Sequence, residues 1–206
     1  MNIDKQLFTK NITKMNASLC WHLLLLSLLL ILFQAFQSEL LFQRNSINEG
    51  QLWRILTGNW VHTNYYHLLM NLTGLGFICL LFKDHFSIKH FYISLFMTTI
   101  AVGLGLYFFS PQLMWYAGLS GALYGLYIIA ASAALKNKDY IASIPILIAI
   151  PAKLIWDSQH NDLIDSSAEL IGAPIATDAH IYGLIAGIML SIFFALSAII
   201  VSRRSH

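Results

Sequence analysis

The chain has 206 residues, of which 57% are hydrophobic and only 11% are charged. Soluble domains carry about a quarter charged residues, so this composition excludes an ordinary soluble globular protein and indicates an integral membrane protein. The formal net charge of +2 comes without a long basic cluster, which argues against a nucleic-acid partner. Cys20 and Cys79 lie in separate apolar runs, so we expect neither a disulfide framework, nor a metal site, nor a cofactor.

Six apolar runs are long enough to be membrane spans, since a spanning helix needs about 20 mostly apolar residues. They are approximately 19–36, 67–82, 91–109, 119–135, 140–156 and 179–201. The first run has no small-residue cleavage site at its end, so we expect a retained anchor rather than a signal peptide. The sequence therefore predicts a single all-α membrane domain over residues 1–206, a bundle of six transmembrane helices without internal repeats.

The charges of the connecting segments predict the orientation of this bundle. If segment 1–18 is cytoplasmic, nine Lys and Arg residues lie inside and three lie outside. The inner residues are Lys5, Lys10, Lys14, Lys83, Lys89, Lys136, Lys138, Arg203 and Arg204, and the outer ones are Arg44, Arg54 and Lys153. This positive-inside asymmetry predicts that both termini are cytoplasmic. A first outer loop then covers 37–65, and an acidic outer loop covers 157–178.

Three of the predicted helices begin on the outer side and carry polar residues near their starts. The second has His67 and Asn71, the fourth has Ser120, and the sixth has His180. Polar residues inside membrane helices are costly and usually face a protein interior or a water-filled cavity. We therefore expect these side chains to converge at one shallow depth on the outer side.

The run 118–125, GLSGALYG, places a serine between small residues at the start of an apolar helix. A serine with no bulky neighbour is open to attack a carbonyl group, and a histidine such as His180 can take its proton and later return it to a leaving amine. The alternative is that this run is only a packing surface and His180 a lone interfacial histidine.

Glycine spacing favours contact between the fourth and sixth helices. Gly121 and Gly125 are four residues apart, as are Gly183 and Gly187. Such pairs let two helix backbones approach closely. This approach could bring His180 within hydrogen-bond distance of the serine.

His67 and Asn71 are four residues apart and share one face of the second helix. Together with the backbone N–H of Ser120 they could stabilise the negative oxygen that forms during acyl transfer. The alternative is that they hold helices together by hydrogen bonds. Asp178 lies two residues before His180 and points elsewhere on a helix, so we expect an N-terminal capping or first-turn carboxylate rather than a third catalytic residue.

Taken together, these motifs resemble the rhomboid intramembrane serine proteases. The matching runs are 53–57 (WRILT), His62, 67–71 (HLLMN), 118–125 and 179–183 (AHIYG). The GxSG and AHxxG motifs, in this order and on these helices, are the specific part, and the match extends from the first outer loop to the last helix. The resemblance implies a bacterial inner-membrane protease with its site toward the periplasm and with membrane-anchored protein substrates.

The resemblance also implies roles for individual residues. Ser120 is the nucleophile and His180 the general base and acid, without a catalytic carboxylate. His67, Asn71 and the Ser120 amide form the oxyanion hole. Tyr124, one helical turn after Ser120, packs against the His180 ring.

Further residues have supporting roles by the same resemblance. Trp53 and Arg54 lie in the first outer loop and brace the core, and His62 supports that loop. Pro145 and Pro151 are expected to interrupt the fifth helix and to bend or loosen it. This would suit the use of that helix as a side gate for substrate.

Within the family, the compact chain and the run 150–156 look similar to rhombosortases, which are thought to process exported proteins with a C-terminal tail of a Gly-Gly motif, an apolar helix and a basic end. A general bacterial rhomboid is the other option. Non-proteolytic relatives that escort membrane proteins lose the serine or the histidine, and both are present here. A small transporter would show broken helices or repeats. The sequence does not indicate an oligomeric state.

Overall fold

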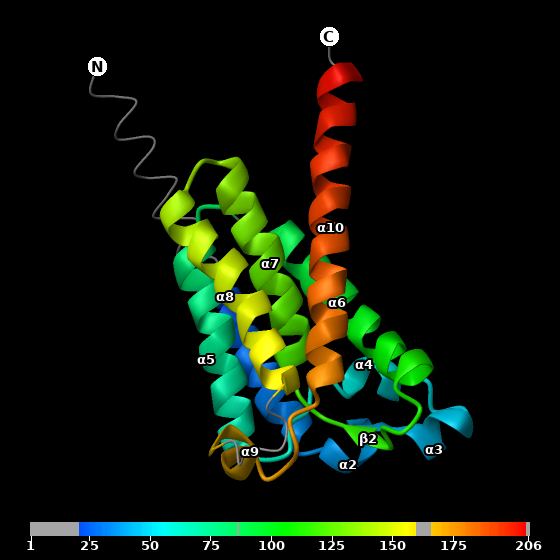
Figure 1. Ribbon diagram of the computed structural model, residues 1–206. Coiled ribbons are helices and arrows are strands. Elements are labelled where there is room, and N and C mark those ends of the chain that lie inside the picture. The colour runs from blue at the N-terminus through cyan, green and yellow to red at the C-terminus, as the bar shows by residue number, and fades with distance from the viewer. Residues whose placement is uncertain (1–20, 86, 160–165, 205–206) are drawn as a thin grey trace.

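The computed structural model describes residues 21–85, 87–159 and 166–204. Six long helices form a bundle, and the short elements gather at one end of it (Figure 1). The long helices are Trp21–Gln34, α5 (Tyr65–Phe82), α6 (Ile88–Phe109), α7 (Ser120–Lys136), α8 (Tyr140–Gln159) and α10 (Thr177–Arg204). The short elements are α2 (Gln37–Leu40), β1 (Phe42–Gln43), α3 (Arg44–Asn48), α4 (Arg54–Thr57), β2 (Trp115–Tyr116) and α9 (Ser166–Ile171).

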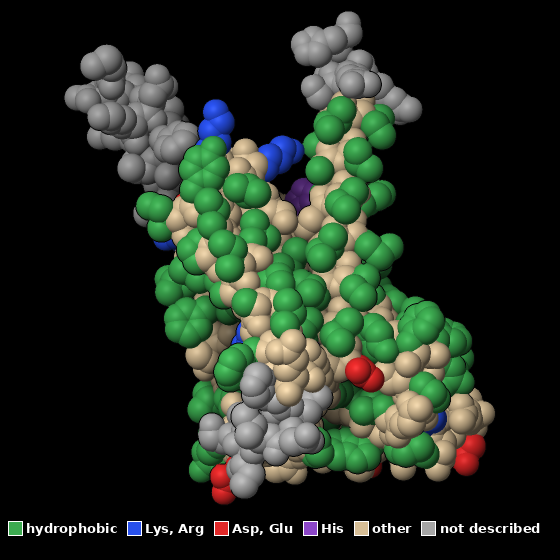
Figure 2. Space-filling model, viewed as in Figure 1, with side chains coloured by type: hydrophobic (Ala, Val, Ile, Leu, Met, Phe, Trp, Pro, Cys, Tyr) green, Lys and Arg blue, Asp and Glu red, His purple; other side chains and the backbone are tan. Residues whose placement is uncertain are grey.

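Each of the six predicted apolar runs overlaps one of the long helices, with ends that differ by at most three residues. Within the described residues, four helices are long and apolar enough to cross a membrane: α5, α6, α8 and α10. The helix Trp21–Gln34 and α7 are shorter. Since α7 contacts α5, α6, α8 and α10, it is surrounded by protein. Hydrophobic side chains cover the outer surfaces of α8 and α10, as expected where helices face lipid (Figure 2).

The prediction of an all-α fold is wrong in one detail, because the structure contains a small two-stranded sheet. Phe42 pairs with Tyr116 and Gln43 with Trp115 in an antiparallel ladder between β1 and β2. Strands of two residues are too short to show an alternating pattern in the sequence. Through this sheet the segment 37–65 holds the segment that leads into α7.

The two segments predicted as outer loops also contain more helix than the sequence indicated. Helices α2, α3 and α4 lie within 37–65, and α9 lies within 157–178. Helix α8 extends to Gln159, so Asp157 belongs to this helix rather than to a loop, and residues 160–165 of the acidic loop lie outside the described part of the chain.

Pro145 and Pro151 do not interrupt the fifth long helix, contrary to the prediction. Helix α8 continues over both prolines. Proline removes one N–H donor from the helix ladder but keeps a helical φ angle. Membrane helices tolerate this loss, so the helix continues, and we expect it to be weakened at the two prolines.

A buried cluster joins the loop end of the bundle to α6 and α10. Phe42, Ile47, Val102, Tyr116 and Ala179 belong to it, and each is at most 4% exposed. Because Tyr116 lies shortly before α7 and Ala179 lies in the first turn of α10, this cluster fixes the end of the bundle where the predicted site residues lie.

Candidate active site

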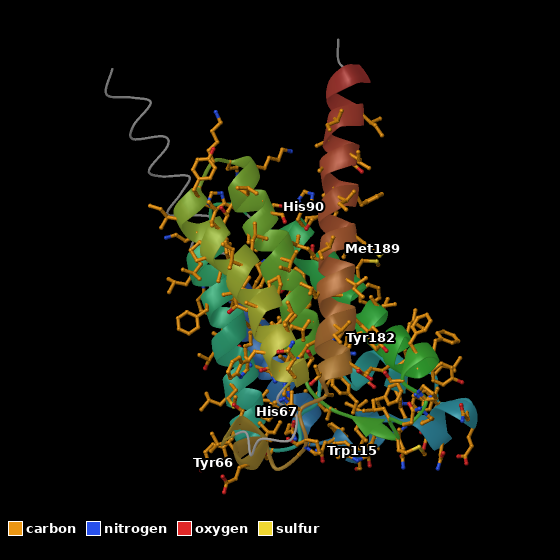
Figure 3. The ribbon with its side chains drawn as sticks, viewed as in Figure 1. Tyr66, His67, His90, Trp115, Tyr182 and Met189 are labelled. Atoms are coloured by element: carbon orange, nitrogen blue, oxygen red, sulfur yellow. The ribbon has the colours of Figure 1, made fainter. Side chains whose placement is uncertain are left out.

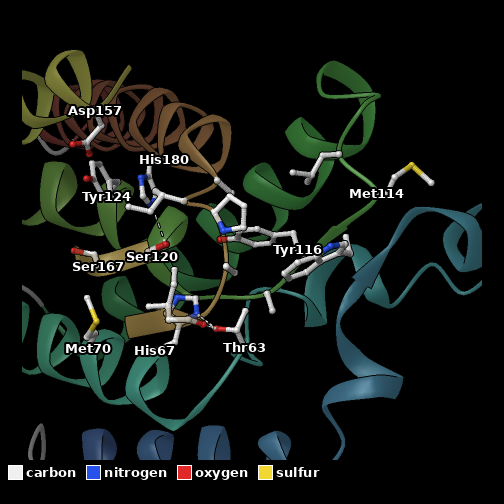
Figure 4. A pocket seen from close by; sticks show the side chains of 18 of the residues that line it. Thr63, His67, Met70, Met114, Tyr116, Ser120, Tyr124, Asp157, Ser167 and His180 are labelled. Carbon is white, nitrogen blue, oxygen red and sulfur yellow. Dashed lines mark hydrogen bonds between the residues drawn. The ribbon is translucent and has the colours of Figure 1, made fainter. Parts of the chain in front are cut away.

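Ser120 and His180 lie side by side at the starts of α7 and α10. The distance between Ser120 Oγ and His180 Nε2 is 2.9 Å, which is a hydrogen bond (Figure 4). The two residues are 60 positions apart in the sequence and come from helices that begin at the same end of the bundle. A serine bonded to a histidine nitrogen is the arrangement of an activated nucleophile.

The four glycines Gly121, Gly125, Gly183 and Gly187, here called the glycine seam, bring these helices together. A Cβ atom at Gly121 would lie 2.8 Å from the carbonyl oxygen of Ala179, and one at Gly183 would collide with the carbonyl oxygen of Gly121. The same close approach holds between Gly125 and Gly183, and between Gly187 and Gly125. The backbones of α7 and α10 are therefore in direct contact, which carries His180 to Ser120.

Gly118 shapes the turn before Ser120. Its φ of +139° is in a region that glycine adopts readily, and a Cβ atom there would lie 2.6 Å from Cε1 of His67. The hydroxyl of Tyr116 donates to the Gly118 carbonyl at 2.6 Å, and the Gly118 N–H donates to the Gly58 carbonyl at 3.1 Å. Burial raises the pKa of Tyr116, so its hydroxyl stays protonated as a donor.

The ring of His180 is held by stacking rather than by a carboxylate. Tyr124 lies parallel to it, with the ring centroids 4.3 Å apart and the planes 8° apart. His180 Nδ1 is buried and has no hydrogen-bond partner within the described part of the chain. The pair is therefore a dyad in this structure, with its histidine positioned by packing.

Asp178 faces away from this ring. Its carboxylate, in the first turn of α10, accepts a 2.5 Å hydrogen bond from the hydroxyl of Ser110, which also contacts the hydroxyl of Tyr182 at 2.9 Å. Ser110 follows the end of α6. Asp178 thus ties the start of α10 to α6, which is the first-turn position predicted from the sequence.

His67 lines the same cavity as the dyad, whereas Asn71 does not. The Cε1–Nε2 edge of His67 faces Gly118, and its Nδ1 lies 3.1 Å from the hydroxyl of Thr63. Asn71 is buried and donates to the His67 carbonyl within its own helix at 3.2 Å. His67 lines the cavity described next, and Asn71 is not among the residues that line it.

A cavity of about 550 Å³ opens above the dyad. Ser120, His180, His67 and Tyr124 form its polar base, and its walls come from segments 112–117 and 173–176 and from α8 and α9. Most of the wall residues are apolar, including Met70, Met114, Trp115 and Ile171. His67 and Trp115 lie at the loop end of the molecule, and His90 lies toward the opposite end (Figure 3). A concave, mostly apolar space with a few polar groups is typical of a ligand-binding site.

The wall formed by α8 carries one ion pair. Lys153 Nζ contacts both carboxylate oxygens of Asp157, at 3.0 and 2.7 Å, and both residues line the cavity. Among the described residues there is no group of three or more His, Cys, Asp or Glu side chains placed to hold a metal ion.

Trp53 and Arg54 hold the segment 37–65, the predicted first outer loop, together. Trp53 Nε1 donates to the carbonyl of Glu39 at 3.2 Å, and the buried Arg54 donates to the carbonyls of Ser38 and Leu41, both at 2.9 Å. These contacts lie within the loop itself. The two residues therefore stabilise the support for β1 and do not touch the dyad.

Arg44 is a supporting residue that the sequence did not single out. Its guanidinium donates to four backbone carbonyls at and beyond the end of α6, namely those of Leu106, Tyr107, Ser110 and Leu113. The last carbonyls of a helix lack partners inside it, so Arg44 caps α6 and attaches it to the loop. A lone arginine in a polar loop carries no signal of this role.

His62 is fully buried beneath His67. Its backbone carbonyl accepts hydrogen bonds from the side chains of Gln34 at 2.6 Å and Gln37 at 2.8 Å, and its ring meets that of His67 edge to face, with centroids 5.0 Å apart. Burial, and secondarily the proximity of His67, lowers the pKa of His62 to about 3. A neutral His62 thus joins the first long helix to the start of α5.

Comparison with known families adds an independent observation. A family model described as the Rhomboid domain matches residues 49–197. This range is more than half of the chain and includes both Ser120 and His180. No curated protein sequence matches the chain.

Proposed function

The chain belongs to the rhomboid family, and from this premise we propose that it is an intramembrane serine endopeptidase with Ser120 as nucleophile and His180 as general base and acid. The observation that supports this most directly is the 2.9 Å hydrogen bond between Ser120 Oγ and His180 Nε2 beside a mostly apolar cavity. A packing surface or a lone interfacial histidine would not require this contact.

In the proposed reaction, Ser120 Oγ attacks the carbonyl carbon of the scissile peptide while His180 Nε2 takes the hydroxyl proton. Collapse of the tetrahedral intermediate breaks the C–N bond, and His180 returns the proton to the leaving amine. Water then attacks the acyl-serine with His180 again as base, which releases the acid product and regenerates Ser120.

The negative oxygen of the intermediate needs donors on the side of Ser120 opposite His180. We propose the backbone N–H of Ser120 and the ring of His67 for this role, because the edge of that ring faces Gly118. Asn71 is the third candidate, because its amide nitrogen carries two hydrogens and the bond to the carbonyl of His67 uses one of them.

We propose that all six long helices span the membrane, with both termini in the cytoplasm and the dyad near the outer, periplasmic surface. Membrane proteins with one apolar segment are then the substrates, cut at the outer edge of that segment. Since cleavage requires an extended backbone at Ser120, we expect small or helix-breaking residues around the scissile bond.

The test is labelling with a fluorophosphonate probe, combined with cleavage of a membrane-anchored substrate. We expect wild type to react with both, and Ser120→Ala and His180→Ala to lose at least about 1,000-fold in cleavage rate. Ser94→Ala is the matched control, because Ser94 is fully buried in α6 and its hydroxyl has no hydrogen-bond partner among the described residues. A wild-type chain that binds substrate without labelling or cleavage would favour a non-proteolytic escort protein instead.

We further propose the rhombosortase activity, the processing of C-terminal tails with a Gly-Gly motif. The support is the similarity of the run 150–156 on α8, where Lys153 faces the cavity. Two substrates that differ only in Gly-Gly or Leu-Leu before the apolar helix test it. Equal cleavage of both would leave a general rhomboid protease.

A further inference from the structure

At the end of the short helix α9, two backbone carbonyl groups receive no hydrogen bond from the helix or from its terminal turn. Gly172, with φ of +65°, follows its last residue, and the N–H groups of Gly172 and Ala173 bond to the carbonyls of Glu169 and Ala168, both at 3.2 Å. This is the Schellman ending of a helix. The carbonyls of Leu170 and Ile171 receive no bond from it.

Two side chains just before α5 satisfy these carbonyls. The hydroxyl of Thr63 donates to Ile171 at 2.6 Å, and the amide nitrogen of Asn64 donates to Leu170 at 3.0 Å. We call this pair of bonds the α9 clamp. Since Ser167 and Ile171 line the cavity, the clamp holds α9 against the space that a substrate would occupy.

The clamp determines where His67 carries its proton. The Thr63 hydroxyl has a single hydrogen, and a carbonyl can only accept, so this hydrogen points to Ile171. The same hydroxyl oxygen lies 3.1 Å from Nδ1 of His67, and this second hydrogen bond then needs a proton on Nδ1. A neutral imidazole has one N–H, so Nε2 of His67 is unprotonated while the clamp is closed.

This protonation state is unsuited to an oxyanion donor. The unprotonated Nε2 belongs to the ring edge that faces Gly118, two residues before Ser120. A lone pair there would repel a negative oxygen, whereas an Nε2–H would stabilise it. With the clamp closed, the site therefore has its nucleophile and base in contact but one oxyanion donor in the wrong tautomer.

We propose that Thr63 is a positioning residue that couples the docking of α9 to the tautomer of His67. This inference rests on the proposed function, because it assigns the moment at which His67 becomes an oxyanion donor. When a polypeptide in the cavity displaces α9, the Thr63 hydrogen turns from Ile171 to Nδ1 of His67. The ring gives its Nδ1 proton to water and takes one from water at Nε2, without a change in net charge.

The direct test is ¹⁵N NMR of the ring nitrogens in histidine-labelled full-length protein. The signals of His67, one of eight histidines, are assigned by their loss in His67→Phe. We expect resting wild type to show a protonated Nδ1 and an unprotonated Nε2. Protonation of Nε2 in the resting protein would overturn the proposal, whatever the protein cleaves.

Three variants separate the tautomer from simple clamping. Thr63→Ser keeps the hydroxyl and is expected to match wild type. Thr63→Val removes it, so we expect the His67 proton to move to Nε2. Asn64→Asp keeps the cap on α5, where the side-chain oxygen accepts from the His67 N–H at 2.8 Å, but loses the donor to Leu170.

For Asn64→Asp we expect a larger Nε2-protonated fraction of His67 although Thr63 is unchanged. If Thr63 and Asn64 only clamp α9, neither Thr63→Val nor Asn64→Asp shifts the tautomer, and that result would refute the coupling. Asn64→Asp keeps the test available if Thr63→Val fails to fold.

The last experiment repeats the NMR measurement on fluorophosphonate-labelled protein, in which a phosphonyl oxygen occupies the oxyanion position. We expect Nε2 of His67 to be protonated in this adduct, and an unprotonated Nε2 there would contradict the switch. Absence of a label on Ser120 would instead refute the proposed protease function, while the resting tautomer would still test the structural inference.

Discussion

The two sides of the cavity are built in different ways. On one side α7 and α10 meet backbone to backbone at the glycine seam. On the other side α8 and α9 are attached more weakly: α8 buries two of its 20 residues, Ser143 and Leu154, whereas α7 buries ten of 17. Helix α9 is tied by the α9 clamp to the two residues just before α5.

This difference separates the geometry of the reaction from access to it. A hydrogen bond between nucleophile and base must be held to a fraction of an ångström, since a displacement of about 1 Å can cost 100-fold in rate. Substrate entry instead needs an element that moves at low cost, and such elements have few buried contacts. The seam fits the first requirement, and we propose that the α8–α9 side meets the second.

The largest expected effect comes from adding one methyl group to the seam. In Gly183→Ala the new Cβ collides with the backbone carbonyl of Gly121, which cannot move aside as a side chain could. The helices must separate, so we expect the cleavage rate to fall by about 100-fold or more and the Tm to drop. Gly76→Ala is the control, because nothing lies within 4 Å of a Cβ atom at Gly76. Full activity in Gly183→Ala would show that the seam does not set the dyad geometry.

An intermediate effect is expected at the stacked ring. Tyr124→Leu removes the plane that lies 4.3 Å from His180, so the imidazole samples other rotamers and kcat falls about 10-fold, with little change in KM. Tyr124→Phe keeps the ring and is expected to retain most of the activity. Steady-state kinetics on one substrate compare the two, and equal losses would assign the role to the hydroxyl rather than to stacking.

A smaller effect is expected at Asp178. If this carboxylate were the third member of a triad, Asp178→Asn would lower kcat by about 10,000-fold. Because it bonds to Ser110 instead, and because the amide oxygen of Asn can still accept that bond, we expect a loss of only about threefold. Ser110→Ala should give a similar loss in the same cleavage assay. A loss above 1,000-fold in Asp178→Asn alone would point to a triad.

Much of the seam could be predicted from the sequence because its signals are local. The GxxxG spacings predicted the approach of two helices, and the shared direction of the helices predicted that Ser120, His67 and His180 would lie at one depth. Asn71 shows the limit of this reasoning. Its position on the same face as His67 was correct, but nothing in the sequence indicated that one of its two amide hydrogens bonds to the His67 carbonyl one turn earlier.

The α8–α9 side and the supporting loop were much less predictable. Thr63, Asn64 and Arg44 act by donating to backbone carbonyls about 60 to 110 residues away in sequence, and such bonds leave no spacing pattern. The two prolines gave a strong local signal of interruption, yet α8 continues over both. Loss of one donor weakens a helix in a membrane without ending it.

The smallest expected effect tests whether this weakness of α8 matters. In Pro151→Ala the restored N–H can bond to the carbonyl four residues earlier, so α8 becomes stiffer without a change in the cavity base. We expect slower hydrogen exchange in the last turns of α8, and a cleavage rate reduced by about two- to threefold because entry past a stiffer helix is slower. Ile148→Ala, at an exposed position of the same helix, leaves the backbone bonds unchanged and serves as the control. A faster cleavage rate in Pro151→Ala would mean that the flexibility of α8 hinders the reaction. The proposal that α8 moves to admit substrate, while the glycine seam keeps the dyad fixed, would then be wrong for this helix.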